Sequence, residues 1–159
     1  MSFYMNNCKI GTYDRRELTG ASVGTGGATQ VGSLQLANAG IWLVRVNHRS
    51  QFNNSSNFLH MGLYTSSTNG SGRLTNDSNI WLQEHPTTNG TGGVDTHGEW
   101  LVNAGTDQSY TLTLYVHIYA YSRTMSTFYT TNDSNGVPDV TALCIKGTTS
   151  TGISTIDTV

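Results

Sequence analysis

The chain has 159 residues, enough for one domain with a buried core. Its net charge of −2 and charged fraction of 11% leave no basic stripe for nucleic-acid binding, and no apolar run is long enough to span a membrane. The chain is crowded with Gly, Ser, Thr and Asn but also holds 8 Tyr and 3 Trp, which predicts an all-β protein with many turns rather than a disordered one.

Residues 1–27 are expected to form an extended N-terminal arm. Residues 22–27, SVGTGG, have the composition of a flexible joint, and the segment before them combines aromatic side chains with a cluster of charges. Aromatic anchors are a common feature of protein interfaces, although a frayed terminus remains the alternative interpretation. On the first interpretation, the arm docks on another protein through Phe3, Tyr4, Tyr13, Arg15 and Arg16.

Two cysteines, Cys8 and Cys144, lie far apart in the sequence and belong to no metal or redox motif. The N-terminus has neither the apolar region nor the cleavage site of a secretory signal. We therefore expect free, partly buried thiols in a protein made in a reducing cytosol. A disulfide would require the arm to pack beside the strand that carries Cys144.

Alternating apolar runs follow the arm and predict about eight strands, separated by polar loops. In chain order we expect strands at 29–36, 41–49, 57–65, 80–84, 97–102, within 101–122, near 125–129 and at 140–146. The longest polar loops are 51–56, 66–79 and 85–93. This layout predicts a single β-sandwich domain over residues 28–147, followed by a tail, 148–159, in which Ile153 and Ile156 add edge pairing.

The run within 101–122 is the most regular of these strands. It begins after a turn at residues 103–107 and alternates with period two, so that one face is aliphatic. The other face becomes aromatic, and aromatic faces are costly to leave in water. Either a second layer of the same chain covers this face or another subunit does; the residues concerned are Tyr115, His117, Tyr119 and Tyr121.

Three tryptophans, Trp42, Trp81 and Trp100, lie within apolar strand patterns. Aromatic side chains supply much of the buried area of a protein core, so we expect core packing. A platform on which a sugar ring stacks is the alternative role.

The sequence contains no recognisable catalytic or metal-binding set. The five histidines are scattered, and neither a His-x-His nor a His-Glu-x-x-His spacing occurs. His97 and Glu99 would share a strand face, an arrangement that is far more often surface than ligand. No Gly-x-Ser-x-Gly elbow occurs either. We expect no cofactor, no metal and no enzymatic activity.

An ordered set of segments carries a family resemblance: VGSLQL at 31–36, GIWLV at 40–44, LVNAGTD at 101–107 and TALCIK at 141–146. Together they resemble the tumour-necrosis-factor-like jelly roll, which complement-type globular heads and knob domains on bacteriophage virions also use. The resemblance spans roughly residues 29–146, with one residue inserted in the Ala104-Gly105-Thr106-Asp107 turn.

The resemblance implies a homotrimer whose inner sheet packs around a threefold axis, with Tyr115, His117, Tyr119 and Tyr121 at the subunit interface. The low charge and the richness in Asn, Ser and Thr look more like a phage virion protein than an animal cytokine.

We therefore expect a non-enzymatic structural protein on the virion surface, assembled in the host cytoplasm. The favoured role is a trimeric capsid decoration or cement protein that binds other virion proteins, such as the major capsid protein. The alternative is a receptor-binding tail-fibre head that recognises a host glycan through its polar loops. The short arm leaves no room for a fibre shaft, which favours decoration.

Overall fold

The computed structural model describes residues 4–5, 8–9, 11–18, 28–51, 59–68, 72, 74, 80–82, 93–106, 112–120, 127–128, 139–149 and 151–156. Every regular element among these residues is a β-strand. The strands are β1 (Tyr4–Met5), β2 (Cys8–Lys9), β3 (Tyr13–Glu17), β4 (Ala28–Leu36), β5 (Gly40–Gln51), β6 (Leu59–Tyr64), β7 (Ile80–Leu82), β8 (Gly93–Ala104), β9 (Leu112–Ala120), β10 (Thr127–Phe128), β11 (Asp139–Lys146) and β12 (Ile153–Ile156).

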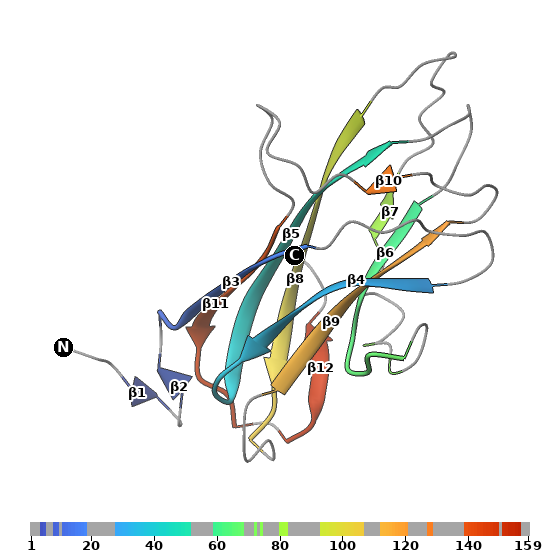
Figure 1. Ribbon diagram of the computed structural model, residues 1–159. Coiled ribbons are helices and arrows are strands. Elements are labelled where there is room, and N and C mark those ends of the chain that lie inside the picture. Colours follow the sequence, from blue (N-terminus) through green and yellow to red (C-terminus); the bar gives the residue numbers. More distant parts are fainter. Residues whose placement is uncertain are drawn as a thin grey trace.

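The strands form two main sheets and a separate small hairpin (Figure 1). The larger sheet has the order β12-β8-β5-β11-β3, with β10 paired to the end of β5. The smaller sheet has the order β4-β9-β6-β7. The hairpin consists of β1 and β2, and every pairing in the molecule's described strands is antiparallel.

The strand order is that of a jelly roll. Without the hairpin, β10 and β12, the first strand pairs with the last (β3 with β11), the second with the seventh (β4 with β9), the third with the sixth (β5 with β8) and the fourth with the fifth (β6 with β7). This is the pattern of one long hairpin rolled into two sheets. The predicted all-β jelly-roll sandwich is therefore confirmed.

The core lies between the two sheets and follows the alternation of the strands. On β5, Trp42, Val44 and Val46 are fully buried, as their period-two spacing predicts. Val31 and Leu34 on β4 break that spacing, yet both are buried. A register shift between residues 30 and 32 explains this, because an extra residue in one strand resets which side chains face inward.

Residues 13–18, which the sequence assigned to the arm, belong to the larger sheet. β3 pairs along β11, and Leu18, directly after it, is a core side chain. A Cβ at Gly32 would meet Leu18 Cδ2 at 2.5 Å, so Leu18 packs directly over this glycine. Asp14 joins β3 to the other sheet, because its Oδ2 accepts a hydrogen bond from the backbone N–H of Gln35 on β4 at 3.2 Å.

Two further segments outside the eight principal strands contribute to the fold. β12 pairs with β8, which confirms the edge pairing expected of Ile153 and Ile156. Leu74 lies in a stretch expected to be a polar loop, but its side chain is buried in the core. Its N–H donates to the carbonyl of Leu63 at 3.1 Å, which brings the segment back onto β6.

The expectation of free thiols needs correction, because Cys144 is buried and disulfide-bonded. The N-terminal segment does pack beside β11, the condition that a disulfide requires. The N–H of Gly11 donates to the carbonyl of Cys144, and the N–H of Cys144 donates to the carbonyl of Thr12, both at 2.9 Å.

Candidate interaction face

The outer face of the larger sheet, the side opposite the core, carries an apolar row. Tyr13, Leu143, Leu43 and Leu101 stand opposite one another on β3, β11, β5 and β8. Tyr13 is 57% exposed and Leu143 36%, and Ile145, two residues along β11, is 41% exposed. Large apolar side chains grouped on a sheet face are costly to leave in water, so this row is a candidate contact surface.

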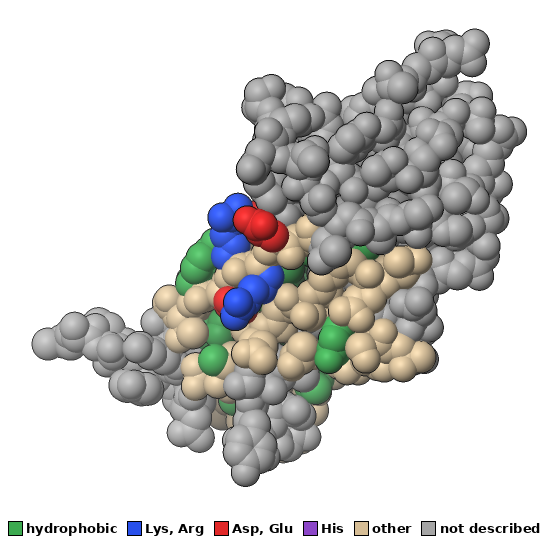
Figure 2. Space-filling view, viewed as in Figure 1, with side chains coloured by type: hydrophobic (Ala, Val, Ile, Leu, Met, Phe, Trp, Pro, Cys, Tyr) green, Lys and Arg blue, Asp and Glu red, His purple; other side chains and the backbone are tan. Residues whose placement is uncertain are grey.

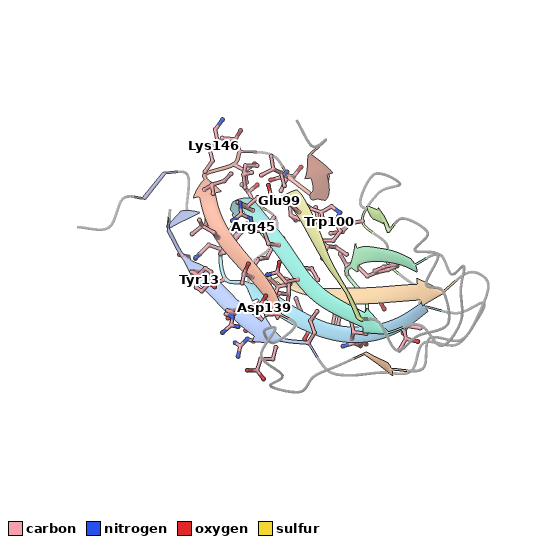
Figure 3. All side chains as sticks on the ribbon, turned by 90° about the horizontal axis from the view of Figure 1, so that it is seen from above. Tyr13, Arg45, Glu99, Trp100, Asp139 and Lys146 are labelled. Carbon is pink, nitrogen blue, oxygen red and sulfur yellow. The ribbon has the colours of Figure 1, made fainter. Side chains whose placement is uncertain are left out.

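A polar row runs beside the apolar one. Arg15, Thr141, Arg45 and Glu99 are in register across the same four strands. Arg45 Nε donates to Glu99 Oε2 at 2.6 Å, and the two side chains point toward each other from neighbouring strands (Figure 3). Both side chains are more than half exposed, so the pair stabilises the fold by at most about 1 kcal/mol.

Asp139 forms the more enclosed polar contact of this face. Its carboxylate accepts hydrogen bonds from Arg15 Nε at 2.5 Å and from Asn47 Nδ2 at 2.8 Å. The side chain of Asp139 is 11% exposed, whereas that of Arg15 is 50% exposed. The hydrogen bond that Arg15 donates to Asp139, together with the negative charge of that carboxylate, raises the pKa of Arg15 above the ordinary value. Asp139 thus links β11, on which it lies, to β3 on one side and to β5 on the other.

A hollow of about 300 Å³ lies on this face and is lined by Arg45, Asn47, Gly98 and Glu99. Gly98 contributes no side chain, while the other three bring a guanidinium, an amide and a carboxylate. These groups supply both hydrogen-bond donors and acceptors. Figure 2 shows basic side chains adjoining acidic ones on the surface of the described residues. Chemically, the hollow suits a neutral polar partner, such as a hydroxyl-rich ligand or a polar edge of another protein.

The predicted trimer-interface residues are only partly within the described structure. Tyr115 lies on β9, is half-buried and stands between Ser33 and Tyr64 in the smaller sheet. His117 and Tyr119 belong to the same strand, but their side chains lie outside the described part of the chain, as does all of Tyr121. The interface assignment remains a prediction.

The predicted docking residues divide in the same way. Tyr13, Arg15 and Arg16 lie on β3, where Arg16 Nε is 3.3 Å from Asp14 Oδ1. Tyr4 lies on β1, but its side chain is not described, and Phe3 is outside the described residues.

The tryptophan prediction is confirmed where it can be checked. Trp42 and Trp100 are buried in the core, which excludes them as an exposed sugar platform. The indole Nε1 of Trp42 donates to the carbonyl of Asn38 at 3.0 Å, which satisfies its polar atom. The side chain of Trp81 lies outside the described residues.

Within the described parts of the chain, no group of three or more His, Cys, Asp or Glu side chains has an arrangement that could hold a metal ion. Glu99, half of the His97 and Glu99 pair, instead contacts Arg45. The described residues also include no helix with the length and apolarity needed to cross a membrane.

The apolar row is the feature that sequence reasoning missed. The sequence predicts a strand at residues 140–146, and in the structure the exposed Leu143 and Ile145 alternate with the buried Val140, Ala142 and Cys144. The signal was present, because a strand that is apolar at successive positions presents an apolar side chain on each face.

No protein-family model and no curated protein matches the chain. Among solved structures, the chain is similar to one in the "Structure of infectious bursal disease virus Gt strain", with 11% identity and a TM-score of 0.49 over 91% of this chain and 40% of the other. A chain in the corresponding Gx-strain structure gives 12% identity and a TM-score of 0.43 over 93% of this chain and 41% of the other. The protein therefore spans about two fifths of the length of these viral chains.

Proposed function

We propose that the protein is a non-enzymatic structural subunit of a virion, a homotrimeric decoration or cement protein on the surface of a bacteriophage head. The observation that carries the proposal is the outer face of the larger sheet, where Tyr13, Leu143 and Ile145 are exposed beside a registered polar row. An exposed apolar row on a sheet face fits a protein partner better than a small molecule, and the jelly roll presents it on a rigid scaffold.

Two faces are available for contact between subunits. The first is the apolar row of the larger sheet, for which the exposure of the side chains is known. The second is the aromatic face of β9, with Tyr115, His117, Tyr119 and the following Tyr121. We place the apolar row first, because its exposed side chains would gain free energy by leaving water, whereas Tyr115, the one described side chain of the aromatic face, is half-buried.

The test is the mass in solution, measured by multi-angle light scattering. The proposal requires a mass close to three times 17.2 kDa. The double variant Leu143→Asp with Ile145→Asp should be monomeric with an unchanged β-sheet circular dichroism spectrum, because it would bury unpaired charges in the interface. The matched variant Tyr119→Asp with Tyr121→Asp should remain trimeric. If instead the Tyr119→Asp, Tyr121→Asp variant is monomeric and the Leu143→Asp, Ile145→Asp variant is trimeric, the interface lies on β9. A monomeric wild-type protein would overturn the proposed trimer.

Docking on the virion is tested with a short deletion. Removing residues 1–27 would also remove β3 and Leu18, so a loss of binding would not separate docking from folding. Removing residues 1–7 takes away Phe3 and Tyr4 but leaves Cys8 and β3. We expect this variant to keep the wild-type oligomeric state and to cosediment at least tenfold less with particles stripped of the protein. Undiminished binding would exclude Phe3 and Tyr4 as docking residues.

A receptor-binding head that recognises a host glycan is the second candidate, and the polar hollow beside Arg45 and Glu99 favours it. Neutral sugars bind through several hydrogen bonds to such side chains. A glycan array probed with the wild-type protein and with Glu99→Gln separates the two functions. Binding that the substitution abolishes would support the receptor role, and an empty array together with particle binding would support decoration.

A further inference from the structure

The sulfur of Cys144 belongs to a disulfide, and the sequence holds only one other cysteine, Cys8. Cys8 lies on β2, in the hairpin that precedes the sandwich. β2 and β11 are neighbouring elements, and Gly11, with a backbone φ of 85°, turns the chain from the hairpin into β3. The two backbone hydrogen bonds that join Gly11 and Thr12 to Cys144 hold this turn against β11.

We propose that a Cys8–Cys144 disulfide is a clasp, closed once by oxidation, that fixes the β1–β2 hairpin to the sandwich. The hairpin lies at the margin of the sandwich near the N-terminus (Figure 1), and among the described strands β1 and β2 pair only with each other. A hairpin of two short strands has little stability of its own. The position of this one therefore depends on its attachment at Cys144. The clasp does not depend on the proposed virion role.

The chemistry is a reversible exchange of two electrons. Closing joins two thiols in one S–S bond and delivers two protons and two electrons to an oxidant of the disulfide class, such as oxidised glutathione. Opening takes two electrons and two protons from a dithiol, which becomes a cyclic disulfide. Free thiols persist in a reducing cytosol, and disulfides persist outside it, so the hairpin would become fixed wherever the folded protein meets an oxidising environment.

The burial of Cys144 determines how the clasp responds. Its side chain is part of the core and its residue is only 1% exposed, so thiolates in solution have little access to its sulfur. Once closed, the clasp should therefore resist mild reductants in the folded state and open readily when the protein is denatured. This distinguishes it from a strained, exposed disulfide that cycles during function.

The connectivity is tested by tryptic digestion of the air-oxidised, alkylated protein without reductant. Cleavage after Lys9, Arg123 and Lys146 gives the peptides Met1–Lys9 and Thr124–Lys146, each with one cysteine. We expect them as one cross-linked species that dithiothreitol separates with a gain of two hydrogens. Two separately alkylated peptides from the oxidised protein would overturn the clasp.

The mechanical role is tested by hydrogen exchange of the full chain. Residues 1–12 should exchange at least tenfold faster in Cys8→Ser than in the oxidised wild-type protein, and its melting temperature should be lower by about 5–10 °C. Dithiothreitol under denaturing conditions, followed by refolding, should bring the wild-type protein to the behaviour of the variant and leave the variant unchanged. Equal exchange rates in the oxidised wild type and the variant would show that the hairpin is held without the disulfide.

Discussion

At the scale of single residues, the carboxylate of Asp139 has more influence on the fold than its position at the first residue of β11 suggests. It accepts hydrogen bonds from Arg15 on β3 and Asn47 on β5 while being mostly buried itself. The Arg45 and Glu99 pair has similar geometry but lies in water. The difference in burial, rather than in distance, decides which contact matters for stability.

We predict that Asp139→Ala lowers the free energy of unfolding by about 1–3 kcal/mol, because it removes the acceptor of two side-chain donors. Glu99→Ala should change it by less than about 1 kcal/mol, since exposed ion pairs contribute little. Urea unfolding of both variants measures the difference. Equal losses would mean that the enclosure of Asp139 has no energetic consequence.

The turn after β8 depends on the absence of a side chain. A Cβ at Gly105 would overlap the backbone of Gly152, so the two turns approach more closely than any other residue would permit. Gly152 has a different requirement: its φ of 81° lies in the left-handed region, but a Cβ there would meet nothing within 4 Å. A side chain at Gly105 would therefore clash with neighbouring backbone, whereas a side chain at Gly152 would have room but would strain the backbone conformation.

Gly105→Ala should consequently cost about 2–4 kcal/mol of stability, because backbone must move to accept the methyl group. Gly152→Ala, the matched control, should cost about 1–2 kcal/mol from backbone strain alone. Thermal unfolding of the two variants provides the comparison. If Gly152→Ala proves the more damaging, the close approach of the two turns is not as tight as described.

At the scale of elements, β3 marks the limit of what alternation predicts. The alternation of Trp42, Val44 and Val46 identified β5 correctly, since one face of that strand is wholly buried. β3 has the sequence YDRRE, and its side chains are exposed or half-buried on both faces. An edge strand of this kind carries no apolar period, and its charges resemble those of a solvated arm. Only pairing with β11, distant in sequence, reveals it.

Leu18 tests whether this strand is integral to the domain. We predict that Leu18→Ala lowers the free energy of unfolding by about 2–5 kcal/mol, the usual cost of emptying a core position. Its exposed neighbour provides the control, because Glu17→Ala should change stability by no more than about 0.5 kcal/mol. A small effect of Leu18→Ala would mean that residues 13–18 are not an integral part of the folded domain.

At the scale of the whole molecule, the ordered motifs predicted the jelly roll, because strand order follows from a rolled hairpin once the strands and turns are known. The candidate face was not predicted. Which apolar side chains remain exposed depends on what the second sheet covers, and alternation alone does not distinguish the two faces of a strand such as β11, where Leu143 and Ala142 are both apolar. The burial of Leu74 was not predicted for a related reason, since a single leucine in a polar stretch produces no periodic apolar pattern.

The position of β11 has a consequence for biosynthesis. This strand lies between β5 and β3, and it is the last of the eight principal strands to be translated. Until its final residues leave the ribosome, β3 has no partner in the larger sheet, and the Val140, Ala142 and Cys144 part of the core is missing. The nascent chain therefore has unpaired strand edges during synthesis, and the two sheets can be completed only after β11 has been synthesised.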